Sequence, residues 1–131
     1  MEEINTMYLT KKDQPEGILF YKKDSPGLQI DIHIQYLNFV LNKHNFYITI
    51  TNNNGEILVP RTEPITIDFA KIDTTEKLDK KLGVGEIALF AELTEEELKN
   101  SNFIKVSINI DNNLERTLVL YIVGGDNELR S

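Results

Sequence analysis

Apolar and polar residues alternate strictly between Leu28 and Tyr36, where every even position is large and apolar and every odd position is polar. Successive side chains of a β-strand point to opposite faces, so the pattern predicts a half-buried strand with one face in water. A helix would scatter the same residues around its circumference. The predicted core lies on the apolar side of this strand and of similar segments, and comprises Ile30, Ile32, Ile34, Ile48, Ile50, Ile108 and Leu120.

Shorter segments of the same kind recur along the chain, and turn-forming residues separate them. Asn and Gly at 52–55, and Asp and Asn at 111–113, tolerate the positive φ of hairpin turns. Pro and Gly at 24–27 are typical of a β-turn. The expected strands cover residues 18–22, 28–36, 46–51, 56–59, 65–69, 85–91, 103–110 and 115–123, and the segment before them has room for an edge strand at 6–10.

One short helix is expected after the strand at 85–91. Thr94 is placed to cap its N-terminus, and Glu97 three residues later completes a capping box. Leu93 and Leu98 flank this box as a hydrophobic staple. Ser101 and the asparagine after it limit the helix to about two turns.

These elements predict an all-β fold, an antiparallel β-sandwich of seven to eight strands with one short helix before the penultimate strand. We expect a single domain over 1–131, with 1–16 as a lead-in segment and 124–131 as a polar tail. The glycines at 83 and 85 precede a strand and not a helix, which predicts a β-turn or bulge and not a phosphate-binding loop.

Composition narrows the classes of function. The chain has 131 residues, no cysteine and a formal net charge of −7. It therefore has no disulfide framework and no thiolate metal site, as is typical of a protein made in the cytoplasm. We expect no nucleic-acid partner, because phosphate neutralisation needs clustered basic residues and the lysine pairs here are scattered. The N-terminus lacks signal-peptide features, and the longest apolar run, 118–123, is far shorter than a membrane span, so no membrane partner is expected.

Candidate chemistry is sparse. His33 and His44 are the two histidines, and without a third clustered ligand they make a poor zinc site, so both are expected to be ordinary surface residues. The 52–56 turn does not fit a calcium loop, since Ile50 and Arg61 occupy ligand positions. No serine or carboxylate lies in a recognisable catalytic motif. We therefore expect no catalytic residue, no metal and no cofactor, in a protein that is not an enzyme.

Strand 115–123 is apolar on both faces, although an antiparallel sandwich should leave one face of each sheet in water. Its second face must be covered by the short helix, by the N-terminal segment or by another chain, and we expect internal cover by the helix. If another chain covers it, self-association or a protein partner is implied. The candidate protein-interaction residues are Val119, Tyr121 and Val123 of this strand, and Phe90 of the similarly apolar strand 85–91.

The order of turns and strands resembles a known domain. Lys-Lys-Asp-Ser-Pro-Gly at 22–27 leads into an alternating strand, Phe-Tyr-Ile-Thr-Ile-Thr-Asn-Asn-Asn-Gly-Glu-Ile-Leu follows at 46–58, and Gly-Glu-Ile-Ala-Leu-Phe at 85–90 runs into Leu-Thr-Glu-Glu-Glu-Leu at 93–98. This resembles the immunoglobulin-like N-terminal domain of upper baseplate and fibre-attachment proteins in phages of Gram-positive bacteria, over residues 17–123. The resemblance implies an immunoglobulin-like sandwich that joins parts of a virion by protein–protein contact. The chain ends after this domain without a stalk, so a small decoration or adaptor protein is expected.

An alternative from another class is a small acidic inhibitor encoded by a phage or mobile element. Its surface carboxylates would mimic nucleic-acid phosphates and block a basic host protein. Mimicry needs acidic side chains lined up on one face, whereas a structural module would scatter them around an apolar or mixed contact patch.

Overall fold

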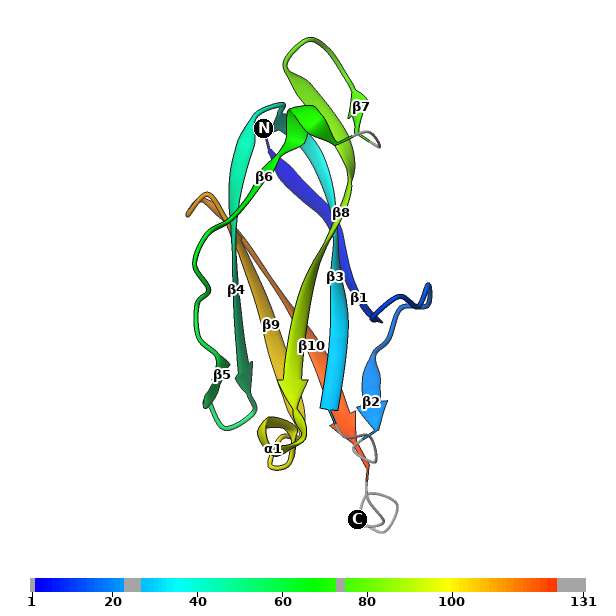
Figure 1. Ribbon diagram of the computed structural model, residues 1–131, viewed down its shortest axis with the longest axis vertical. Helices are drawn as coiled ribbons and strands as arrows, with labels where there is room; N and C mark the ends of the chain where they lie inside the picture. Colours follow the sequence, from blue (N-terminus) through cyan, green and yellow to red (C-terminus); the bar gives the residue numbers. More distant parts are fainter. Residues whose placement is uncertain (1, 23–26, 73–74, 125–131) are drawn as a thin grey trace.

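Two β-sheets pack against each other in the computed structural model of the chain, which describes residues 2–22, 27–72 and 75–124. The molecule is elongated, and its long strands run close to the long axis (Figure 1). Ten strands are present in the described ranges, against the seven to eight expected. Only β7, a strand of two residues at the edge of the first sheet, has no counterpart among the expected segments.

The first sheet is antiparallel and has the strand order β1–β3–β8–β7. Its long central strand confirms the predicted alternation, because Ile30, Ile32 and Ile34 are fully buried while Asp31 and His33 lie on the outer face. The bounds are β1 (Glu3–Lys11), β3 (Gly27–Val40), β8 (Leu82–Thr94) and β7 (Glu76–Lys77).

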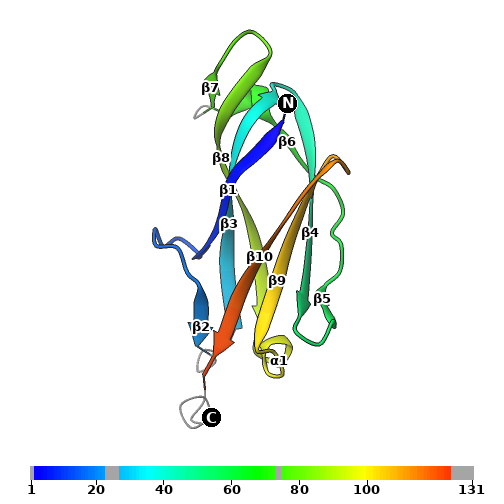
Figure 2. The same cartoon turned by 180° about the vertical axis from the view of Figure 1, so that it is seen from behind.

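The second sheet has the order β2–β10–β9–β4–β5, and β6 also pairs with β4. All of its pairs are antiparallel except β2 with β10, which run parallel. In both views β2 lies beside the lower part of β10, and the β1–β2 connection projects from the side of the molecule (Figures 1 and 2). The bounds are β2 (Phe20–Lys22), β10 (Leu114–Val123), β9 (Phe103–Ile110), β4 (Lys43–Asn52), β5 (Ile57–Val59) and β6 (Ile65–Asp68).

The core lies between the two sheets, as the alternation predicts. Each of the seven predicted core residues is at most 2% exposed. The upper part of the core also contains a cluster of rings, in which Phe69 of the short 3-10 helix η1 (Phe69–Lys71) packs between Tyr36, Phe39 and Phe46. The sandwich is thus held by apolar burial, the largest favourable contribution to folding.

A bulge in β3 explains the two glycines at the start of β8. The β3–β8 register shifts between Tyr36 and Phe39, and Asn38 takes a positive φ of 59°. Gly83 and Gly85 lie opposite this bulge, inside the strand, and not in a turn before it. A Cβ on Gly85 would lie 2.6 Å from the Tyr36 hydroxyl oxygen, so the buried Tyr36 ring occupies the space that a side chain would need.

The predicted helix is present but short. Helix α1 (Glu95–Leu98) has the complete capping box of Thr94 and Glu97, and both staple residues, Leu93 and Leu98, are buried. It has four residues and therefore one turn, against the two expected. The Ser101 hydroxyl donates a hydrogen bond to the Glu97 carbonyl oxygen at the C-terminal end of the helix.

The hairpin turns agree with the expectations wherever they are described. Gly55 has a φ of 80°, and the Asn52 side chain accepts hydrogen bonds from the backbone of the same turn. Asp111 and Asn112 both take positive φ in the β9–β10 turn. The turn expected at 24–27 and the polar tail at 124–131 lie almost entirely outside the described residues.

Candidate protein-interaction surface

Exposed apolar side chains gather where β2 meets β10. Eight large apolar residues are exposed in the described part of the chain, and four of them lie here. We call these four residues the apolar corner: Leu19 (80% exposed), Phe20 (54%), Val119 (42%) and Tyr121 (57%). The other four, Val40, Ile57, Leu78 and Phe90, are distributed over other elements.

Strand register places the aromatic members of the corner in one row. Phe20 of β2 pairs with Tyr121 of β10, which pairs with Phe103 of β9. The ring centroids of Tyr121 and Phe103 are 5.9 Å apart. Residues Leu120 and Ile122 point inward and are buried. Because side chains alternate along a strand, the odd-numbered residues of β10 present their side chains on the outer face.

The expectation that the helix covers this face is wrong. Helix α1 contacts the ends of β3 and β8 instead, where Leu98 is buried. It lies at the lower end of the sandwich, where β8 ends (Figure 1). Val119 and Tyr121 consequently stay exposed among the described residues.

The other two candidate residues are placed differently. Val123 is half-buried at the end of β10. Phe90 is 45% exposed, but it pairs with Asp31 on the outer face of the first sheet, and the Lys12 ammonium lies 5.1 Å from its ring centroid. The structure therefore brings Val119 and Tyr121 together and separates Phe90 from them.

Sequence reasoning missed Leu19 and Phe20. Both lie in Ile18–Tyr21, a run of four consecutive apolar residues. A strand with one wet face would alternate, so this run already indicated a segment with apolar side chains on both sides. Tyr21 is buried, and its hydroxyl donates to the Gly27 carbonyl oxygen, which leaves Phe20 to point outward.

An open groove of about 310 Å³ lies next to the apolar corner, between the edges of the two sheets. Met7 and Leu9 of β1 line one side, Leu118 and Val119 of β10 line the other, and Ile18 is also at its surface. The groove lies where the chain passes from the first sheet to the second. The Ile18 amide donates to the Leu9 carbonyl oxygen of the first sheet. The carbonyl oxygen of the next residue, Leu19, accepts from the Tyr121 amide of the second sheet.

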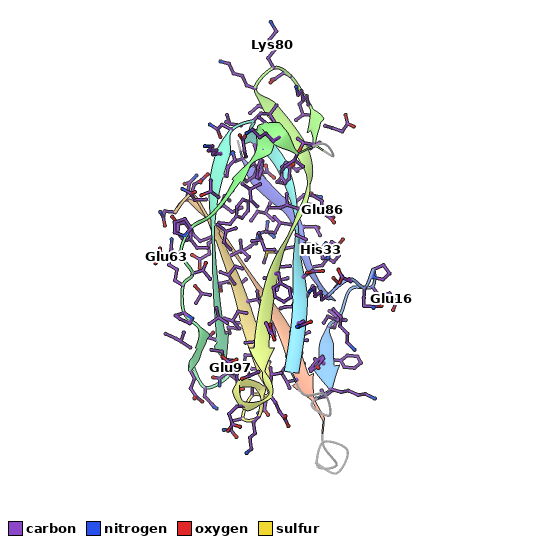
Figure 3. The ribbon with its side chains drawn as sticks, viewed as in Figure 1. Glu16, His33, Glu63, Lys80, Glu86 and Glu97 are labelled. Atoms are coloured by element: carbon purple, nitrogen blue, oxygen red, sulfur yellow. The ribbon has the colours of Figure 1, made fainter. Side chains whose placement is uncertain are left out.

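A polar cluster lies on the outer face of the first sheet. Glu86 accepts hydrogen bonds from the Tyr8 hydroxyl (3.1 Å) and the Gln35 amide (3.0 Å), and its Oε2 lies 3.3 Å from Nδ1 of His33. Burial raises the pKa of Glu86, but the hydrogen bonds from Gln35, Tyr8 and His33 outweigh this and hold the pKa below its usual value. Burial, and then the contact with Glu86, raise the pKa of Tyr8. Figure 3 shows His33 and Glu86 side by side on β3 and β8.

Within this cluster a hydroxyl, an imidazole and a carboxylate follow one another, as they do in the catalytic triads of hydrolases. The Thr10 hydroxyl oxygen lies 2.8 Å from Nε2 of His33, whose Nδ1 faces Glu86. A nucleophile must meet its substrate, but Thr10 is 1% exposed. We therefore assign the cluster a structural role: it joins β1, β3 and β8 and satisfies a buried hydroxyl.

The expectation that both histidines are ordinary surface residues is wrong for His44. His44 lies in β4, is 4% exposed and contacts the ring of Phe69. His33 is half-buried within the polar cluster, where its ring stacks on Tyr8 with centroids 4.6 Å apart.

Within 2–22, 27–72 and 75–124, no three His, Cys, Asp or Glu side chains are grouped so as to hold a metal ion. No helix in the same ranges has the length and apolar character needed to cross a membrane. No known protein-family model matches the chain, and a comparison with curated proteins finds no similar sequence.

Proposed function

We propose that this chain is a non-enzymatic structural or adaptor protein of a phage particle, and that it acts by protein–protein contact through the apolar corner. The observation that carries the proposal is the concentration of Leu19, Phe20, Val119 and Tyr121 in one place. Contiguous exposed apolar side chains on a folded domain mark interaction sites, whereas single ones are ordinary. Aromatic residues are also the most common anchors of interface cores.

We further propose that the sandwich is immunoglobulin-like. The orders β1–β3–β8–β7 and β2–β10–β9–β4–β5 support this, because immunoglobulin domains place four strands on one sheet and a G–F–C sheet opposite. The parallel pairing of β2 with the last strand fits a first strand divided between the two sheets. This arrangement is in keeping with the resemblance to fibre-attachment domains of phages.

The distribution of acidic side chains favours the adaptor over the nucleic-acid mimic. Glu16, Glu63 and Glu97 lie on two opposite sides and at the lower end of the molecule (Figure 3). A mimic of nucleic acid would need such carboxylates in line on one face. Scattered carboxylates around an apolar contact are what a structural module requires.

Particle composition tests this proposal. Phage particles purified by density gradient from a culture that carries the gene should contain the chain at a fixed copy number, measured by quantitative mass spectrometry. Deletion of the gene should remove the chain together with a fibre or decoration component. A chain found only among host-cell proteins, and not in intact particles, would contradict the proposal.

A further inference from the structure

We infer that the free edge of β10 beside the groove is a docking site for an extended, acidic segment of another protein, which adds to the second sheet as a strand. The inference rests on the proposed function, protein–protein contact, and specifies the mode of contact and the chemistry of the partner. Addition of a strand to an exposed sheet edge is a common way for proteins to bind peptides.

The backbone of β10 is only partly paired on this side. The Tyr121 amide donates to the Leu19 carbonyl oxygen of β2, and the Ile122 amide donates to the Asn102 carbonyl oxygen on the opposite side. Since backbone groups alternate in direction along a strand, those of Thr117 and Val119 point the same way as those of Tyr121. Pairing with β2 covers only Tyr121–Val123. Within the described ranges the edge at Thr117 and Val119 is therefore unpaired.

The groove supplies space for the side chains of an added strand. A strand at this edge would direct alternate side chains inward, against Met7 and Leu9 on one side and Leu118 on the other. These three residues are apolar, so the inward side chains of the partner should be apolar too. The outward ones would lie near Val119 and Tyr121.

The charged residues near this edge indicate the charge that the partner should carry. No carboxylate among the described residues forms an ion pair with Lys105 or Arg116, the two basic side chains of β9 and β10. Lys105 is the neighbour of Val119 across the sheet, and Arg116 donates to the Ile4 carbonyl oxygen at the upper end of the groove. Lys105 and Arg116 are the basic residues of β9 and β10, and Glu115 is the only acidic residue of these two strands.

Basic residues thus outnumber acidic ones at this edge, although the whole chain has 21 acidic and 14 basic residues. An approaching acidic segment would be attracted here and repelled by most of the remaining surface. A second copy of this acidic chain is correspondingly disfavoured, which leaves an acidic segment of a different protein as the occupant.

A synthetic probe tests the site directly. The probe is a fluorescently labelled, end-blocked peptide in which Val alternates with Glu, and binding to the full chain is measured by fluorescence anisotropy. We expect saturable binding, weakened by about tenfold when Lys replaces Glu in the peptide or in the Lys105→Glu variant. Equal binding of the acidic and basic peptides would overturn the charge argument.

Backbone pairing is tested on both partners. Val119→Pro removes the outward amide at an edge position that tolerates proline, and we expect about tenfold weaker binding. Val119→Thr keeps the amide and the branched shape, and should bind as the wild type does. If Val119→Pro does not fold, the wild type is tested with a peptide that is N-methylated at the amides facing β10. This peptide should also bind about tenfold more weakly than the unmethylated one.

The outcomes separate this inference from the proposed function. Undiminished binding of the N-methylated peptide, or no binding of the acidic peptide, overturns strand addition even if the chain is found in particles. Concentration-dependent dimers that protect the Thr117 and Val119 amides from exchange without peptide would show a second copy at this edge, and would also overturn the inference. Peptide binding by a chain that is missing from particles would contradict the proposed function alone.

Discussion

Nδ1 of His44 lies 2.6 Å from Oδ2 of Asp111, and so connects β4 to the β9–β10 turn. Nε2 of the same ring lies 2.7 Å from the Val40 carbonyl oxygen. The second Asp111 oxygen accepts from the Asn45 amide at 2.7 Å. A carbonyl and a carboxylate only accept hydrogen bonds, so each ring nitrogen of His44 faces an acceptor. One aspartate therefore fixes the turn, the start of β4 and a buried ring.

Loss of this contact should destabilise the fold. We expect Asp111→Ala to lower the free energy of unfolding by about 1–3 kcal/mol, because it leaves a buried imidazole nitrogen without an acceptor. Asn112→Ala is the matched control, since Asn112 has nearly the same positive φ (56° against 55°) but does not contact His44. Urea denaturation compares the two. An equal loss in Asn112→Ala, which removes the contact with Arg61 and keeps the one between His44 and Asp111, would contradict a contribution from the His44–Asp111 contact.

Gly85 should not tolerate a side chain. A Cβ there would lie 2.6 Å from the hydroxyl oxygen and 2.9 Å from Cζ of Tyr36, which is 1% exposed. We expect Gly85→Ala to cost about 1–3 kcal/mol by overpacking. The control is Gly17→Ala, whose Cβ would meet its nearest atoms at ordinary distances of 3.7 and 3.8 Å. Thermal melts that show no difference between the two variants would contradict the described β3–β8 packing.

Ile32 tests the position of the core. Its side chain is 0% exposed, and Ile32→Ala should lower the free energy of unfolding by roughly 2–5 kcal/mol. Ile57→Ala removes the same atoms from a side chain that is 64% exposed, and should change stability by less than about 0.5 kcal/mol. A loss below about 1 kcal/mol for Ile32→Ala, measured by urea denaturation, would mean that the register or the buried face is wrong.

The lowered pKa of Glu86 predicts a specific pH dependence of stability. Its folded pKa lies below that of the unfolded chain, because hydrogen bonds to the carboxylate outweigh its burial. The carboxylate therefore contributes stability that is fully present above the ordinary glutamate pKa of about 4.3, and that is lost as the pH falls through the lower folded pKa. Glu86→Gln should be less stable than the wild type near neutral pH, and the difference should narrow in acid. A difference that is constant across this range would contradict the assignment.

Residue patterns predicted the long strands well because burial of one face leaves a direct trace in the sequence. Strand β9 matches its predicted bounds, 103–110, and Ile30, Ile32 and Ile34 are buried as expected. The alternation cannot show where a strand continues past an irregularity. The extension of β3 to Val40 passes a bulge at Asn38, which depends on the space that Gly85 leaves across the sheet.

Only part of the candidate surface could be predicted from the sequence. The apolar outer face of β10 was visible in the sequence, but what covers it depends on where the helix packs, which local pattern does not determine. Burial of His44 likewise depends on Asp111, 67 residues away. Phe90 has the same apolar setting as Tyr121 in the sequence, and only the sheet order separates them.

That separation makes Phe90 the matched control for the central claim, protein–protein contact through the apolar corner. Tyr121 and Phe90 are exposed aromatic residues (57% and 45%) on the outer faces of different sheets. The most direct measurement is the affinity of wild type, Tyr121→Asp and Phe90→Asp for proteins of the purified particle, by biolayer interferometry, with circular dichroism to verify folding. We expect Tyr121→Asp to fold and bind at least about tenfold more weakly, as for an interface anchor, while Phe90→Asp binds like the wild type. Unchanged binding by folded Tyr121→Asp, or a wild type that stays monomeric and binds no particle protein, would contradict the claim.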